Sequence, residues 1–148
     1  MKLTWLDAQD TPISTDELAR VGALHERLEL DPSAYQPSID RLMAERGYVT
    51  QDIVELHPET PNLGALCDKF KDEHLHTDDE VRLVLEGEGI FDLRSADDRW
   101  MRVQVDPGDL LVVPAGLYHR FFLTDRKQIR CVRLFKDSSG WTPVYRGA

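Results

Sequence analysis

Residues 73–82 read EHLHTDDEVR, and this stretch decides which fold the rest of the chain is expected to adopt. It holds two of the five histidines, one residue apart, and a glutamate follows at position 80. Alternate residues of an extended strand share one face, so His74 and His76 would lie together, with Glu80 if the alternation continues. The packing of a protein core gives little reason to place two histidines and a glutamate on one face, whereas a metal ion requires such a group of ligands. We therefore expect metal ligands here.

A fourth candidate ligand, His119, opens the segment HRFFLT. In a barrel, a distant strand can bring its side chain to the same interior point. Three imidazoles and one carboxylate favour iron, nickel, manganese or cobalt with two open positions, because structural zinc is usually closed and rich in cysteine. A lone histidine is more often a surface or core residue than a ligand, and we assign His25 and His57 to that class.

The chain beyond residue 80 is typical of an antiparallel β structure. Short segments rich in branched and aromatic residues follow one another, namely VRLVLE, GIFDL, RWMRVQV, LLVV, HRFFLT and QIRCVRLF. The turn sequences GEG, RSADD, DPGD, PAG and TDRK separate them. This pattern predicts a sandwich or a barrel.

The N-terminal part, residues 1–73, is predicted to be largely helical. STDELARVGALHERLEL (14–30) has a Ser or Thr cap and leucines at helical spacing, and Asp31-Pro32 should end it. PSIDRLMAERGY (37–48) and LGALCDKFKDE (63–73) predict two more helices, and TQDIVEL (50–56) predicts a strand. The expectation is one domain over residues 1–148, with the barrel and metal site in residues 74–148 and the helices packed outside.

Charge and composition limit the classes of partner. The formal net charge is −9, so neither nucleic acid nor an anionic membrane is an expected partner. Cys67 and Cys131 have no recognised pair spacing and are predicted to be buried, reduced thiols. The N-terminal residues lack the apolar core of a signal peptide, and no long apolar run occurs, so we expect a cytoplasmic protein.

Two spacings resemble the two sequence motifs of the cupin superfamily. H-x-H-x3-E-x6-G spans residues 74–87, and G-x5-P-x-G-x2-H spans residues 108–119. The resemblance implies a mainly β fold, a cupin jelly-roll β-barrel with a metal in its interior. The chain departs from the usual motifs at Asp68, where a glycine often stands, and at Leu123, where an asparagine often stands. Neither departure removes a ligand.

A more specific resemblance covers most of the chain. KFKDEHLHTDDEVRLVLEGEGIFDLR, PAGLYHRF and CVRLF are similar to segments of acireductone dioxygenase, an enzyme of methionine salvage. The resemblance implies that His74, His76, Glu80 and His119 bind one divalent transition metal per chain, Fe2+ or Ni2+. It also implies a monomer.

The resemblance further implies the reaction. The substrate would be an enediol, 1,2-dihydroxy-3-keto-5-methylthiopentene, which reacts with O2. The iron form would yield formate and 4-methylthio-2-oxobutanoate. The nickel form would yield formate, carbon monoxide and methylthiopropionate.

Two arginines are candidates to bind the substrate. If Glu80 faces the barrel interior, strand alternation places Arg82 there as well, and Arg133 raises the same question from an otherwise apolar row. A buried arginine needs a counter-charge, so the pattern leaves two interpretations equal: a pair with a core carboxylate, or contact with a bound anion. The resemblance implies the second, because fixed positive charge would stabilise an ionised enediol.

Two neighbours of the histidines are further candidates. Phe121 follows His119 by two residues and should share its inward face, where it could pack on the substrate or belong to the core. Glu73 adjoins His74 and is a candidate to support the metal ligands from outside.

Two functions of other kinds fit the same motifs. One is another metal-dependent cupin enzyme, a dioxygenase or an isomerase, acting on a different small enediol or diketone. The other is a non-catalytic cupin that binds a small acid. Oxygen uptake with acireductone would separate the binding protein from the enzymes, and the far end of the pocket would separate the enzymes from one another.

Overall fold

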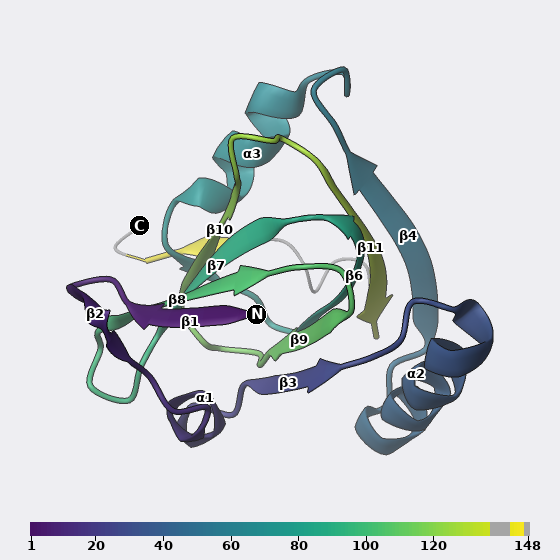
Figure 1. The fold of residues 1–148 in the computed structure, drawn as a ribbon, viewed down its shortest axis with the longest axis horizontal. Helices are drawn as coiled ribbons and strands as arrows, with labels where there is room; N and C mark the ends of the chain where they lie inside the picture. The colour runs from purple at the N-terminus through teal and green to yellow at the C-terminus, as the bar shows by residue number, and fades with distance from the viewer. Residues whose placement is uncertain (137–142, 147–148) are drawn as a thin grey trace.

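Two antiparallel β-sheets enclose the interior of the protein, as the computed structural model shows (Figure 1). The structure describes residues 1–136 and 143–146. The larger sheet has the strand order β12-β5-β10-β7-β8-β1-β2, and the smaller has the order β3-β9-β6-β11-β4. The strands are β1 Lys2–Trp5, β2 Ala8–Pro12, β3 Leu24–Arg27, β4 Thr50–Leu56, β5 His74–Leu75, β6 Glu80–Gly87, β7 Gly89–Arg94, β8 Trp100–Val105, β9 Asp109–Val113, β10 His119–Leu123, β11 Ile129–Phe135 and β12 Val144–Tyr145. The predicted cupin fold is confirmed.

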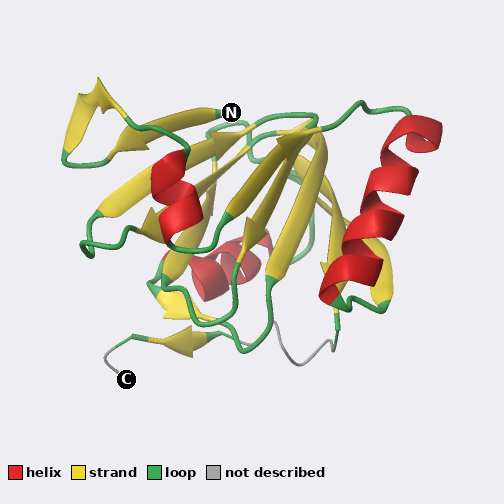
Figure 2. Ribbon diagram, turned by 90° about the horizontal axis from the view of Figure 1, so that it is seen from below, coloured by secondary structure: helices red, strands yellow, loops and turns green. Residues whose placement is uncertain are grey.

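The helices lie outside the sheets (Figure 2). They are α1 Asp16–Arg20, α2 Pro32–Arg46 and α3 Leu63–Lys71. α3 packs beside β10. No helix in the described part of the chain has the length and apolar composition needed to span a membrane.

The smaller sheet is covered on both faces, and this explains the long apolar runs of its central strands. In β6, Val84 belongs to the core between the two sheets, whereas Val81 and Leu83 belong to a second core under α2. Tyr35, Ile39 and Leu42 are the buried residues of α2 in that second core. Because strand side chains alternate, β6 supplies apolar anchors outward and leaves its other face for the interior.

The predicted helix over residues 14–30 is wrong. Only α1 forms, and the chain continues through Gly22, whose φ is +82°, a conformation that interrupts a helix. Leu24 and the residues after it form β3, which pairs with β9 at the edge of the smaller sheet. The leucine spacing fits a helix, but pairing with β9 satisfies the backbone of this segment and overrides that local preference.

Residues 1–73 are not largely helical as predicted, because strand pairing also determines the structure of this part. This part also contains four strands, and β1 and β2 extend the larger sheet by pairing along β8 and β1. β4 occurs at the residues predicted, and α3 occupies most of its predicted range. The start of α2 is earlier than residue 37, because Asp31 accepts a hydrogen bond from the Ser33 N–H at 3.0 Å and Pro32 follows it at the first helical position.

We predict that Ile39→Ala destabilises the protein by about 2–5 kcal/mol, because it leaves a cavity between α2 and the sheet. Ile39 is fully buried, whereas Ile53 on β4 is 51% exposed and serves as the matched control. Ile53→Ala should cost less than about 1 kcal/mol. Urea unfolding at constant metal loading measures both, and equal losses would show that α2 does not anchor the sheet.

Candidate metal centre

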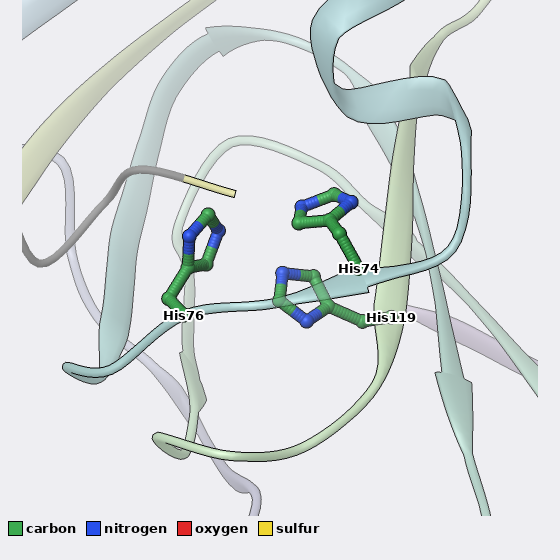
Figure 3. A group of neighbouring side chains, drawn as sticks. All are labelled: His74, His76 and His119. Atoms are coloured by element: carbon green, nitrogen blue, oxygen red, sulfur yellow. The ribbon is translucent and has the colours of Figure 1, made fainter. Parts of the chain in front are cut away.

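Three buried histidines converge at one point between the sheets (Figure 3). His74 comes from β5, His76 from the loop after it, and His119 from the start of β10, where it pairs directly with His74. One ring nitrogen of each lies within 4.8 Å of the others. The ring centroids are separated by 4.5–5.0 Å. The short strand, the loop after it and the pairing of β5 with β10 therefore bring the three histidines together.

Hydrogen bonds orient two of these rings for metal binding. His74 Nδ1 lies 2.7 Å from the Asp72 carbonyl oxygen, and His119 Nδ1 lies 2.8 Å from the Leu117 carbonyl oxygen. A carbonyl only accepts, so each Nδ1 carries the proton and the lone pair of the neutral ring is on Nε2. His74 Nε2 is buried and has no hydrogen-bond partner among the described residues. An orphaned acceptor in this orientation fits a metal ligand.

The environment keeps His74 in its neutral form. Burial lowers the pKa of His74 to about 4, and the nearby His119 and His76 act in the same direction, while the bond to the Asp72 carbonyl opposes them. The imidazole therefore retains its lone pair at neutral pH, and a metal would not have to displace a proton from it.

Glu80 joins the histidine group through one carboxylate oxygen. Its Oε2 lies 2.9 Å from His119 Nε2 and 3.7 Å from His76 Nε2. Burial acts to raise the pKa of Glu80, but Arg82 and the two histidines outweigh it and hold the pKa well below its usual range. Two acceptors this close need a proton or a cation between them. Two ligands at right angles on a metal, with bonds of about 2.1 Å, would lie about 3.0 Å apart, which fits the first of these distances.

The second oxygen of Glu80 holds Arg82. Arg82 Nε and Nη2 donate to Glu80 Oε1 at 3.1 and 3.0 Å, and Arg82 is only 6% exposed, as the strand alternation predicts. Burial acts to lower the pKa of Arg82, but Glu80 beside it raises the pKa and keeps the guanidinium charged. The guanidinium carbon lies 5.0 Å from the Phe121 ring centroid, and Phe121 faces inward at 5% exposed.

A cavity of about 230 Å³ adjoins this arrangement. It is lined by Val54, Leu56, Leu66, Cys67, Lys69, Phe70, Arg82, Phe121 and Arg133. Phe70 connects it to the histidine group, because the Phe70 ring centroid lies 5.6 Å from that of His74 and 6.2 Å from that of His76. The polar lining residues are cationic and most of the others are apolar.

The apolar wall was not identified from the sequence. Val54 and Leu56 come from β4, and Leu66 and Phe70 come from α3, so two separate elements build it. The available signal was the alternation of β4, which places Val54 and Leu56 on the same face. Cys67 also lines the cavity and is half-buried, whereas Cys131 is buried, and both thiols are free.

Arg133 and Glu73 each form ion pairs with other side chains of the protein. Arg133 lines the cavity, but its Nε and Nη2 donate to the Asp52 carboxylate at 2.8 and 2.6 Å. Glu73 accepts from Arg94 at 2.7 and 3.1 Å and from Arg146 at 2.8 Å. The group that orients His74 is the Asp72 carbonyl, so the contacts of Glu73 give no support to its predicted role beside the ligands.

Asp79 connects the two motifs, although no sequence pattern singled it out. Its Oδ1 accepts from the Ala115 N–H at 2.8 Å, and its Oδ2 accepts from the Tyr48 hydroxyl at 2.5 Å. The Gly116 N–H donates to the His76 carbonyl at 2.9 Å beside this link. The loop that carries His76 is thereby fixed to the loop that precedes His119.

Comparison with known proteins gives one consistent result. The ARD/ARD' family model matches residues 7–143. An acireductone dioxygenase of Heterostelium pallidum is 42% identical over 99% of this chain and 98% of its own length. That of Dictyostelium discoideum is 38% identical over 99% of each chain. The solved structure of acireductone dioxygenase from Bacillus anthracis, with a cadmium ion in its active centre, aligns with a TM-score of 0.89 at 30% identity, covering 97% of this chain and 96% of that one.

The barrel and its three-histidine group define a metal-binding cupin. Within that superfamily the similarity extends over nearly the whole chain at more than a third identity to the curated relatives. The chain belongs to the ARD/ARD' family, the acireductone dioxygenases, and is a metal-dependent dioxygenase.

We predict that Asp79→Ala lowers metal affinity about 10- to 100-fold, because the loops carrying His76 and His119 lose their shared anchor. Asp40→Ala is the control, since Asp40 is exposed and its carboxylate accepts a hydrogen bond from the Gln36 side chain on the same helix, away from both loops. A chelator competition titration with Ni2+ measures the affinity of each variant. Unchanged affinity in Asp79→Ala would show that the histidines are held without this link.

Proposed function

We propose that this protein is an acireductone dioxygenase of methionine salvage. It would cleave 1,2-dihydroxy-3-keto-5-methylthiopentene with O2 to formate and 4-methylthio-2-oxobutanoate in an iron form. In a nickel form it would give formate, carbon monoxide and methylthiopropionate. The observation that carries the proposal is the cavity beside the histidine group, which combines buried Arg82 with an apolar wall.

The proposed metal site consists of His74, His76, Glu80 and His119, holding one Fe2+ or Ni2+ per chain. The orphaned Nε2 of His74 and the short distance from Glu80 to His119 support this set. When bound, the metal would supply Lewis acidity to two oxygens of the enediol and lower their pKa. Glu80 has a second task, because its other oxygen fixes Arg82 beside the same point.

Arg82 and Arg133 are proposed to hold the ionised enediol. Among the residues that the structure describes, the lining includes three cationic side chains, Lys69 and these two arginines, and no carboxylate, although the whole chain has a net charge of −9. A cavity of one sign with low-dielectric walls concentrates the field on a small anion. Charge-assisted hydrogen bonds from a guanidinium would then orient its oxygens.

The apolar wall is proposed to take the methylthio end of the substrate. Leu56, Leu66 and Phe70 offer a surface that a thioether can contact without leaving a polar group unpaired. Phe121 would pack against the enediol end, next to Arg82. Together these side chains would exclude water from a reactive anion.

The partners would be the small enediol and O2, the location would be the cytoplasm, and the protein would act as a monomer formed by one cupin domain over residues 1–148.

We predict that the bound metal selects the products. An acireductone has three neighbouring oxygens and can chelate through more than one pair of them, and metals in one ligand set differ in Lewis acidity, redox access and preferred geometry. The protein is stripped, reloaded separately with Fe2+ and Ni2+, and supplied with acireductone and O2. Carbon monoxide is expected from the nickel form only, together with methylthiopropionate in place of the keto acid.

Chelator-treated protein is the control for the spontaneous reaction of acireductone with O2. Identical products from the two loaded forms, with metal contents confirmed, would exclude selection by the metal. Oxygen uptake no faster than that of the metal-free control, with either ion, would overturn the proposed function.

A further inference from the structure

The arginines of the cavity are neighbours across two strands. Arg82 of β6 is the direct partner of Arg133 of β11, and Arg133 is in turn the direct partner of Asp52 of β4. Like charges directly opposite each other destabilise a sheet. A row of this kind therefore needs a counter-charge for each arginine.

Each arginine has its own carboxylate. Glu80 pairs with Arg82 at 3.0 Å, and Asp52 pairs with Arg133 at 2.6 Å. Both arginines line the cavity, but neither carboxylate is among the lining residues. The carboxylates thus neutralise the pair from outside, and the cationic groups are the ones presented to a ligand.

The two arginines differ in their exposure to solvent. The Arg82 side chain is 7% exposed and also lies against the Phe121 and Phe91 rings, 5.0 and 6.0 Å from their centroids. The Arg133 side chain is 29% exposed, and its guanidinium carbon lies 5.5 Å from the Phe135 ring centroid. A partly exposed arginine side chain retains several rotamers unless its partners restrict them.

Asp52 provides that restriction through its geometry. Its two oxygens accept separately from Nε and Nη2 of Arg133, so the pair is bidentate and side-on and fixes the plane of the guanidinium as well as its position. The Asp52 charge also opposes the attraction of an anion to Arg133. Asp52 is 38% exposed, however, so solvent screens this opposition, and the orienting effect is expected to dominate.

We propose that Asp52 is a positioning residue that holds the Arg133 guanidinium in the lining of the cavity and thereby raises affinity for the anionic substrate. This inference rests on the proposed function of the cavity. Asp52 itself does not touch the substrate.

The test compares Asp52→Asn, Arg133→Ala and the double variant in nickel-loaded protein. Asp52→Asn should raise the KM for acireductone about 5- to 20-fold, the scale of the rotamer freedom that Arg133 regains, with kcat and metal content changed little. Adding Asp52→Asn to Arg133→Ala should change KM no further, because the group that Asp52 positions is gone.

Asp7→Asn is the matched control. Asp7 makes the same bidentate contact with Arg99, at 2.7 and 3.1 Å, and neither residue lines the cavity. It should leave KM unchanged. A KM that stays the same or falls in Asp52→Asn, an additional effect in the double variant, or an equal rise in Asp7→Asn would each overturn the inference.

Calorimetric titration of the same nickel-loaded proteins with oxalate separates this inference from the proposed function. Oxalate is a small chelating dianion, so its affinity should fall in Asp52→Asn by a similar factor and should not fall in Asp7→Asn. If the wild type consumes no acireductone, the proposed function fails, and the oxalate affinities still decide whether Asp52 positions Arg133. If turnover is normal but oxalate affinity and KM are both insensitive to Asp52→Asn, only the inference fails.

Discussion

The buried carboxylate of Glu80 is the constraint on which the other interior groups depend. A charge in this position is tolerated only if it is fully paired, and Glu80 is paired on both sides, toward His119 and His76 through one oxygen and toward Arg82 through the other. The histidine group and the cationic end of the cavity therefore share one anion. Without the histidines or without Arg82, part of the buried Glu80 charge would be left unpaired.

This shared anion is positioned by a strand that also holds the fold together. β6 lies in the centre of its sheet, between β9 and β11. Its outward residues Val81 and Leu83 pack under α2, and its inward residues Glu80 and Arg82 face the cavity side. A shift of register by one residue would turn Val81 and Leu83 toward the histidines and would place Glu80 and Arg82 in the apolar layer under α2. The stability of the smaller sheet and the placement of the site thus depend on one period-two pattern.

Features that depend on neighbouring residues or on a motif spacing could be predicted from the sequence. Features that depend on how distant strands pair could not. His74 and His76 share a face through local alternation, and His119 was added from the motif spacing, so the convergence of the three was predictable. The segment after Gly22 was not, because its leucines suit a helix and only pairing with β9 makes it a strand. The bond between Arg133 and Asp52 was equally hidden, since it depends on the register of β4 against β11, which no local pattern specifies.

Because β4 lies at the edge of its sheet, the cavity wall that it forms is less stable than the interior that holds the histidines and Glu80. Among the described strands, β4 is hydrogen-bonded only to β11, and Ile53 on its outer face is exposed. Strands held on one side by few buried contacts open at lower free energy than central strands. Amides of β4 should therefore exchange with solvent hydrogen sooner than those of β6. The wall that carries Asp52 can yield and reclose while the histidines and Glu80, anchored in the interior, keep their arrangement.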